Sequence, residues 1–132
     1  MTFLLDTNAW IAVINPSPSP VKEKFARHQP NAIRLCAVVK AELLWGAYRS
    51  TRREANLALL EKLFGQFASL PFDDLAAEHY GQIRADLTAR GTPIGPNDLM
   101  IAAIARAHDL VLVTHNQREF SRVEKLRLED WM

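Results

Sequence analysis

Near its amino terminus the chain reads Phe3-Leu4-Leu5-Asp6-Thr7-Asn8, a short apolar run that ends abruptly at a carboxylate. A second apolar stretch, residues 9–14, follows the two small polar residues. Short apolar runs are typical of strands in a parallel sheet, and open α/β folds bind ligands at the carboxyl ends of such strands. We therefore predict a strand over residues 2–6 that delivers Asp6 to that edge, with Thr7 or Asn8 capping a helix that ends near residue 14.

The rest of the chain alternates between short apolar runs and longer stretches with helical periodicity. Further strands are predicted over residues 32–37, 68–72, 110–114 and 123–128, and helices over residues 20–25, 38–49, 53–66, 73–90 and 97–108. Strands that alternate with helices are typical of an α/β fold with a mostly parallel sheet. We therefore predict a sheet of about four or five strands, with residues 1–132 forming one domain.

The composition narrows the class of protein. The chain is 48% hydrophobic and 23% charged, which is typical of a globular domain and not of a disordered segment. Its net charge is only +1, so any nucleic-acid binding must depend on local basic patches. Cys36 is the single cysteine, which excludes an internal disulfide and a cysteine-rich zinc site. No apolar segment resembles a membrane span or a signal core, so we expect a cytoplasmic protein.

Two further acids stand in apolar surroundings, Glu42 in Ala41-Glu42-Leu43-Leu44-Trp45 and Asp98 in Asn97-Asp98-Leu99-Met100-Ile101. Carboxylates on otherwise buried faces are costly unless they are paired or bound to metal. Alternatively, Asp98 caps its helix and Glu42 pairs with Lys40 or Arg49. If instead the three acids meet at one edge of the sheet, their oxygens favour Mg²⁺ or Mn²⁺ over zinc.

A polar segment, Thr114-His115-Asn116-Gln117-Arg118-Glu119, follows the strand predicted over residues 110–114. It would bring the oxygens of Asn116 or Glu119 to the same edge as Asp6. Such a cluster repels itself without a cation, but with one it orients a phosphate and lowers the pKa of a bound water. The pattern therefore indicates a phosphodiesterase site.

These motifs together resemble one known family. They are Leu5-Asp6-Thr7-Asn8, Ala41-Glu42-Leu43 with Gly46 after it, the run from Gly91 to Asp98, the run from Val113 to Phe120, and Leu128-Glu129-Asp130-Trp131. In this order, and over nearly the whole chain, they resemble a PIN-domain ribonuclease, and more narrowly the VapC toxins of type II toxin–antitoxin pairs. The resemblance implies a three-layer α/β/α PIN-like fold and a metal-dependent endoribonuclease.

The resemblance also assigns roles. Asp6, Glu42 and Asp98 become the core acidic residues, holding Mg²⁺ or Mn²⁺ and positioning the attacking water, with a 5′-phosphate and a 3′-hydroxyl as products. Many PIN domains have an aspartate where this chain has Asn116, so Asn116 and Glu119 are both candidates for the fourth position. Two hydroxyls, those of Thr7 and Thr114, are candidates to orient the carboxylates.

Candidate binding partners come from the residues themselves and from the same resemblance. Three arginines, Arg49, Arg52 and Arg53, form a basic cluster that is a candidate to bind RNA phosphates. The alternative is that they only form a solvated helix end. Trp10, Trp45 and Tyr48 are candidates for an apolar groove that holds the tail of a VapB-type antitoxin, and core packing is the alternative. The resemblance further implies a homodimer, for which the predicted helices 53–66 and 76–87 offer apolar faces, and a transfer RNA substrate, most narrowly the anticodon stem-loop of initiator tRNA.

Two other functions remain open at this point. One is a PIN nuclease of RNA processing without a toxin role, and the other is a catalytically silent PIN module that only binds. Other enzyme classes fit poorly. A receiver domain or a haloacid-type phosphatase also begins with an aspartate after a strand, but the second requires an acid where Asn8 stands. No glycine-rich phosphate loop or local serine-nucleophile motif occurs.

Overall fold

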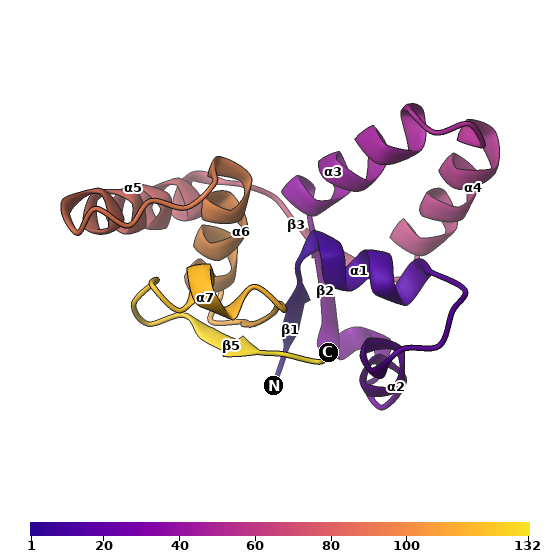
Figure 1. Ribbon diagram of the computed structural model, residues 1–132, viewed down its shortest axis with the longest axis horizontal. Helices are drawn as coiled ribbons and strands as arrows, with labels where there is room; N and C mark the ends of the chain where they lie inside the picture. Colours follow the sequence, from indigo (N-terminus) through magenta and orange to yellow (C-terminus); the bar gives the residue numbers. More distant parts are fainter.

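The computed structural model describes residues 1–132 as a three-layer α/β/α sandwich (Figure 1). In chain order its elements are β1 (Phe3–Leu5), α1 (Thr7–Ile14), α2 (Pro20–Ala26), a 3₁₀ turn η1 (Pro30–Ala32), β2 (Ile33–Cys36), α3 (Ala37–Tyr48), α4 (Arg53–Phe64), β3 (Ala68–Leu70), α5 (Asp74–Ala89), α6 (Pro96–Ala107), β4 (Val111–Val113), α7 (Gln117–Phe120) and β5 (Arg127–Glu129). Figure 1 shows α3 with α4 as one helical arm and α5 with α6 as another, with the strands between them. None of the helices combines the length and apolarity needed to cross a bilayer.

All five strands run parallel, in the order β3-β2-β1-β4-β5. The chain builds outward from β1 to β2 and β3, and then returns to the other side of β1 to add β4 and β5. Such a reversal of strand order leaves a crevice at the carboxyl ends of the two strands that flank it, here β1 and β4. The predicted α/β fold is confirmed, and its topology points to the end of β1, where Asp6 lies.

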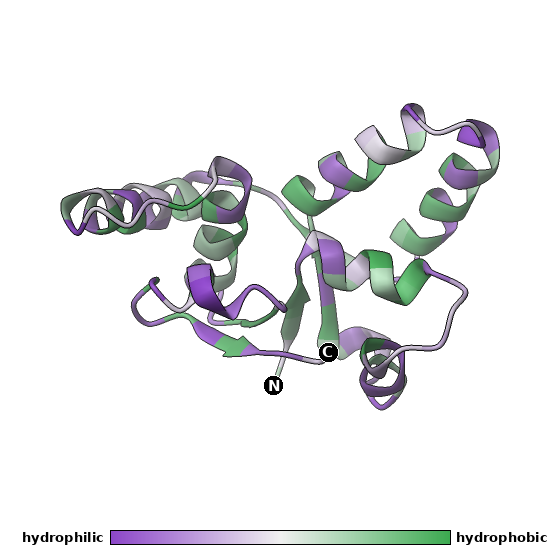
Figure 2. Ribbon diagram, viewed as in Figure 1, coloured by the Kyte–Doolittle hydropathy of each residue, from purple (hydrophilic) through white to green (hydrophobic).

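The central strands are fully apolar because they are covered on both faces. Every residue of β1 and β4 is buried, and Figure 2 shows β1 as a green, hydrophobic strand at the middle of the molecule. Trp10 extends this core: it is fully buried and packs edge-on against Phe25 and Phe67, with ring centroids 5.7 and 5.0 Å away. The expectation that Trp10 lines a partner groove is therefore wrong, because the side chain has no exposed surface.

The helix termini follow local capping chemistry. Asp73 caps α5, its carboxylate accepting a hydrogen bond from the Ala76 amide. Gly91 ends the same helix with a φ of +69°, which a residue with a Cβ adopts only at a cost. The prediction that Thr7 or Asn8 caps α1 is wrong, because Asp6 itself is the N-cap.

The last strand is also displaced from its predicted position. The apolar run over residues 123–128 predicted its location, but β5 covers Arg127–Glu129, and Val123 is a buried residue of the preceding turns. The hydrogen bond from the Thr114 amide to the Glu129 carbonyl, 3.0 Å long, continues the pairing of β4 with β5 at the carboxyl edge. The residues that follow β5 therefore leave the sheet at the same edge as Asp6.

Candidate active site

Asp6 lies at the carboxyl end of β1 and is buried. Its backbone amide donates to the Val113 carbonyl across to β4, and its Oδ1 accepts the Ala9 amide at 2.9 Å. Burial raises the pKa of Asp6 above its usual range, while hydrogen bonds from Thr114 and the Ala9 amide oppose that rise. The first turn of α1 thus fixes the Asp6 carboxylate through Oδ1, and Oδ2 takes no part in this helix cap.

Glu42 reaches the same edge from α3. The Thr7 hydroxyl, in the first turn of α1, donates to Glu42 Oε1 at 2.5 Å. This contact joins residues 35 positions apart in the chain and fixes the direction of the glutamate. The position of Thr7 therefore fits the predicted role of a hydroxyl that orients a carboxylate, here that of Glu42.

Asp98 approaches from the opposite arm, in the first turn of α6. The N-cap of this helix is Gly95, so Asp98 does not cap it. Burial raises the pKa of Asp98 to about 6, and the charges of Asp6, Glu42 and Glu119 add to the effect. Three acids from three other segments thus lie close enough to Asp98 to repel its charge.

Asn116 and Glu119 have separate structural roles. Asn116 is the N-cap of α7, and its backbone amide donates to the Thr114 hydroxyl at 3.0 Å. Its side-chain Nδ2 donates to Glu119 Oε2 at 3.3 Å. Glu119 therefore brings a carboxylate near enough to Asp98 to raise its pKa, and Asn116 donates to that carboxylate.

We call Asp6, Glu42, Asp98 and Glu119 the carboxylate cluster. The ion pairs of the protein join Arg90 to Asp86, His115 to Asp130 and Arg127 to Asp109, so none includes a member of the cluster. The alternative in which Glu42 forms an ion pair with Lys40 or Arg49 is wrong. Lys40 Nζ lies over the Phe64 ring, and the Arg49 guanidinium stacks on Trp45 at 3.8 Å from the ring centroid.

The cluster fits a hard divalent cation in its donor chemistry. It offers carboxylate oxygens from four segments, without sulfur or a nearby lysine or arginine partner, which favours Mg²⁺ or Mn²⁺. No three acidic, histidine or cysteine side chains yet converge tightly enough to hold an ion. Carboxylates that lie this near one another repel, and a bound cation would relieve that repulsion.

A groove of about 470 Å³ adjoins the cluster between α1, α3 and α4. Thr7 and Glu42 belong to its lining, together with the apolar side chains Ile11, Ile14, Leu43, Trp45, Leu59 and Leu60. Trp45 is 64% exposed, although large apolar side chains are usually covered. Tyr48 is also exposed but does not line the groove, so of the three predicted aromatic residues only Trp45 does.

The predicted basic cluster lies at the turn of the α3–α4 arm. Arg52 is exposed at the N-cap of α4, and Arg53 Nε donates to the Tyr48 carbonyl at 2.7 Å. Arg49 lines the groove beside Trp45. The three arginines therefore do not act alike: Arg53 helps close the end of α3, whereas no hydrogen bond or ion pair engages the side chain of Arg52.

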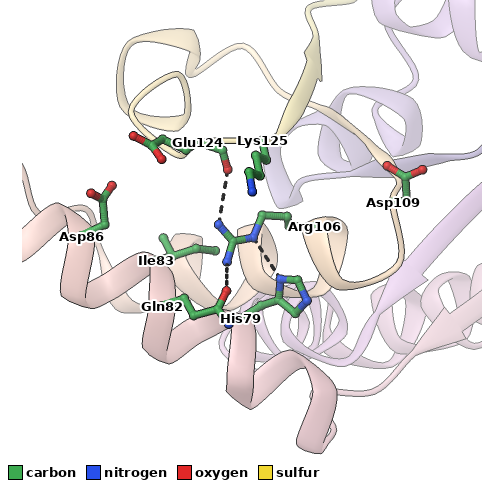
Figure 3. Close-up of a pocket in the computed structure, with 8 residues that line it drawn as sticks. All are labelled: His79, Gln82, Ile83, Asp86, Arg106, Asp109, Glu124 and Lys125. Carbon is green, nitrogen blue, oxygen red and sulfur yellow. Dashed lines mark hydrogen bonds between the residues drawn. The ribbon is translucent and has the colours of Figure 1, made fainter.

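A second polar pocket, of about 540 Å³, lies away from the cluster between α5, α6 and the turn before β5 (Figure 3). Arg106 is at its centre and donates to His79 Nδ1 at 2.9 Å, to Gln82 Oε1 at 2.8 Å and to the Glu124 carbonyl at 3.3 Å. Desolvation, with the charge of Arg106, lowers the pKa of His79, so its ring accepts this hydrogen bond as a neutral imidazole. We call this the Arg106 pocket.

Sequence reasoning missed Asp130, whose charge contributes to the raised pKa of Asp6. The signal was present, because Asp130 follows a strand that runs parallel to β4 and therefore emerges at the same edge. Its carboxylate holds His115 Nδ1 at 3.0 Å. The two side chains flank the cluster without belonging to it.

A five-stranded parallel sheet with four unpaired acids at its central crevice defines a class of protein: the chain belongs to the PIN-domain family, whose model matches residues 3–126. Within that family, the relatives that it matches over nearly their whole length include several VapC ribonucleases. It is 44% identical over 131 residues to the tRNA(fMet)-specific endonuclease VapC of Shigella flexneri, covering 99% of this chain and 98% of the relative. It is 39% identical to ribonuclease VapC2 of Haemophilus influenzae, covering 100% and 99% of the two chains.

Solved structures support the same family assignment. A chain in the crystal structure of DNA-bound VapBC from Salmonella typhimurium matches with a TM-score of 0.92 at 41% identity, over 100% of this chain and 99% of the other. The three-layer PIN fold and the nuclease class expected from the motifs are confirmed by these findings.

Proposed function

We propose that the protein is the toxin of a type II toxin–antitoxin pair, a Mg²⁺- or Mn²⁺-dependent endoribonuclease that cuts transfer RNA. PIN-domain nucleases of this kind depend on a metal ion in general. The observation that carries the proposal is the unpaired carboxylate cluster, which collects four acids at the strand-order reversal and gives none of them a cationic partner. The Shigella flexneri relative, named for tRNA(fMet), supports initiator tRNA as the substrate, and we propose its anticodon stem-loop as the part that is cut.

The mechanism assigns each residue a task. Asp6 and Asp98 would hold the cation, which would neutralise phosphate charge and lower the pKa of a bound water. Glu42, oriented by the Thr7 hydroxyl, accepts the proton of that water during in-line attack. Glu119, held by Asn116, completes the negative site. Cleavage leaves a 5′-phosphate and a 3′-hydroxyl.

The groove beside the cluster supports an antitoxin partner. Its exposed apolar lining, with Trp45 and Ile11, fits the apolar face of a helix or tail, and Glu42 in the same lining would attract a basic side chain. A VapB-type antitoxin bound there covers the cluster and blocks access of RNA. Truncation of Trp45 to alanine should weaken co-purification with the antitoxin, whereas Trp10→Ala should unfold the core before it affects binding.

We further propose that Arg52 contacts RNA phosphates at the tip of the α3–α4 arm, with weaker help from Arg53. Replacing Arg52 with alanine should weaken RNA binding and reduce its salt dependence by about one phosphate contact. Arg53→Ala should act mainly by loosening the turn, because Arg53 already donates to the Tyr48 carbonyl. Unchanged affinity and salt slope for Arg52→Ala would remove it from the RNA site.

Assembly and alternative roles belong to the same proposal. A homodimer would use faces of α4 and α5 that lie outside the groove, such as the start of α5, where Leu75 is about half exposed. Expression of the protein without an antitoxin separates the toxin from a nuclease of RNA processing. A toxin should arrest growth under this condition, whereas a processing nuclease should not. A silent binding module is distinguished by the absence of any cleavage.

The decisive experiment is the incubation of total cellular RNA with antitoxin-free protein, in magnesium or in EDTA, for the parent and for Asp6→Asn. Discrete products that require magnesium and vanish with the substitution support the proposal, and sequencing their ends names the RNA. Absence of metal-dependent cleavage by folded parent protein would contradict it.

A further inference from the structure

His115 and Asp130 form a hydrogen-bonded pair at the rim of the candidate active site. His115 Nδ1 lies 3.0 Å from Asp130 Oδ2, and the side chain of His115 is 71% exposed against 33% for Asp130. The pair joins the turn after β4 to the segment after β5. Nothing in the mechanism above uses either residue.

Asp130 is firmly held. Its Oδ1 accepts the Met132 amide at 2.9 Å, and its carbonyl accepts from Lys24 Nζ at 3.4 Å. The next residue, Trp131, is buried and stacks on His28 with the rings 4° from parallel. The hydrogen bond from Met132 first, and the one from His115 next, hold the pKa of Asp130 below its usual range. Asp130 is therefore a fixed carboxylate on an anchored segment.

The pair determines which ring nitrogen of His115 is free. A carboxylate only accepts hydrogen bonds, so Nδ1 carries the proton that Asp130 receives. In the neutral ring Nε2 is then an acceptor without a partner in the protein, on the edge of the ring away from Asp130. Asp130 thus orients an exposed hydrogen-bond acceptor.

This acceptor lies next to the catalytic edge. The neighbouring residue Thr114 hydrogen-bonds to Asp6, and Asn116 on the other side holds Glu119. A cavity of about 160 Å³ lies beside this pair and is lined by His115, Asp130, Thr114 and the exposed Asn8, together with six apolar residues. Since Thr114 belongs to this lining and holds Asp6, the cavity lies beside a residue that positions the cluster.

We propose that His115 Nε2 accepts a hydrogen bond from a ribose 2′-hydroxyl of the nucleotide beside the scissile phosphate, with Asp130 as the residue that positions the ring. The 2′-hydroxyl is the group by which a protein distinguishes RNA from DNA, and it is a donor that matches this acceptor. His115 is then a specificity determinant of the nuclease. The inference rests on the proposed ribonuclease function, since it concerns the substrate of that same site.

The test combines atomic changes on both sides of the contact. The probe is a synthetic stem-loop RNA with the sequence around the cleavage site mapped in total RNA, and a series in which each copy carries a single 2′-deoxy nucleotide. Single-turnover cleavage in magnesium is measured for the parent, His115→Asn and His115→Gln. Asparagine places a nitrogen near Nδ1 and keeps the contact with Asp130, whereas glutamine places its amide near Nε2, so the two variants remove opposite halves of the ring's function.

In the parent, one 2′-deoxy position near the cut should slow cleavage by about three- to tenfold, as expected for one hydrogen bond. His115→Asn should abolish that penalty at that position alone, and His115→Gln should retain part of it. Asp130→Ala should reduce the penalty at the same position, which loss of stability alone would not do. Thermal melting of each variant confirms that it is folded.

Three results would overturn the inference. Equal 2′-deoxy penalties in the parent and in His115→Asn would leave the nuclease intact and remove His115 from ribose recognition. A uniform loss of affinity at all positions, with a lower salt dependence, would assign His115 to a phosphate instead. Failure of the parent to cut any RNA would contradict the proposed function itself, and is distinguished from the other two by the unmodified stem-loop.

Discussion

The carboxylate cluster and the Arg106 pocket both hold charged groups that are partly withdrawn from water, but they satisfy them differently. In the Arg106 pocket every nitrogen of the guanidinium donates to an acceptor (Figure 3). Asp86 and Asp109 in its lining are paired with Arg90 and Arg127. In the cluster four acids lie near one another without a cationic partner, and the pKa of Asp98 rises to about 6. Since uncompensated charge destabilises a fold, its persistence at one edge indicates function, whereas the satisfied pocket indicates structure.

The largest difference between the two regions should appear in activity. Asp98→Asn removes a charge that holds the cation, and should slow RNA cleavage by roughly a thousandfold, since a bound metal supplies several kcal/mol of transition-state stabilisation. Glu124→Gln is the matched control, because it neutralises an exposed acid of the Arg106 pocket and should leave cleavage unchanged. Comparable losses in both variants would mean that the cluster has no special role.

The next difference should appear in stability. Arg106→Ala removes three hydrogen bonds and should lower the free energy of unfolding by about 1–2 kcal/mol, reduced by the partial exposure of the site. Arg84→Ala, which removes an exposed arginine of α5 whose side chain hydrogen-bonds only to Tyr80, should cost less than about 0.5 kcal/mol. Urea unfolding measures both. If the folded Arg106→Ala variant no longer cleaved RNA, the claim that the Arg106 pocket is structural and not catalytic would be contradicted.

The smallest expected effect is on the pH dependence of stability. The pKa of Asp98 is raised from 3.8 to about 6 in the folded protein, so the native state holds this proton more tightly than the unfolded chain does. The resulting stabilisation is present below about pH 4 and is lost as the pH rises through about 6. In EDTA, Asp98→Asn should therefore gain stability relative to the parent over this range, by about 1 kcal/mol after allowance for the exposure of Asp98. A difference that stays constant from pH 4.5 to pH 8 would show that Asp98 is not strained by its neighbours.

The acids of the site were accessible to sequence reasoning because each is a local anomaly. Asp6 interrupts an apolar run, and Glu42 and Asp98 stand among apolar neighbours, so the cost of burying them is visible from adjacent residues alone. The strand positions were likewise readable from apolar runs that are covered on both faces. Neither inference requires knowledge of contacts between distant segments.

What sequence reasoning missed depends on such contacts. Trp10 looked like a groove residue beside Asp6, but it packs on Phe25 and Phe67, which lie 15 and more residues away. The choice between Asn116 and Glu119 depends on which side chain caps α7, and the pairing of Asp130 with His115 depends on the register of β5 against β4. The displaced position of β5 hid that register, because the apolar signal of Val123 belongs to the turns before the strand.

The measurement that tests the central claim most directly is the binding of Mn²⁺ to antitoxin-free protein, followed by electron paramagnetic resonance for the parent and for Asp6→Asn with Asp98→Asn. The account predicts saturable binding by the parent, displaced by excess Mg²⁺, and its loss in the folded double variant. Equal binding by both proteins, or none by the folded parent, would contradict the claim that these carboxylates stay unpaired in order to hold a divalent cation.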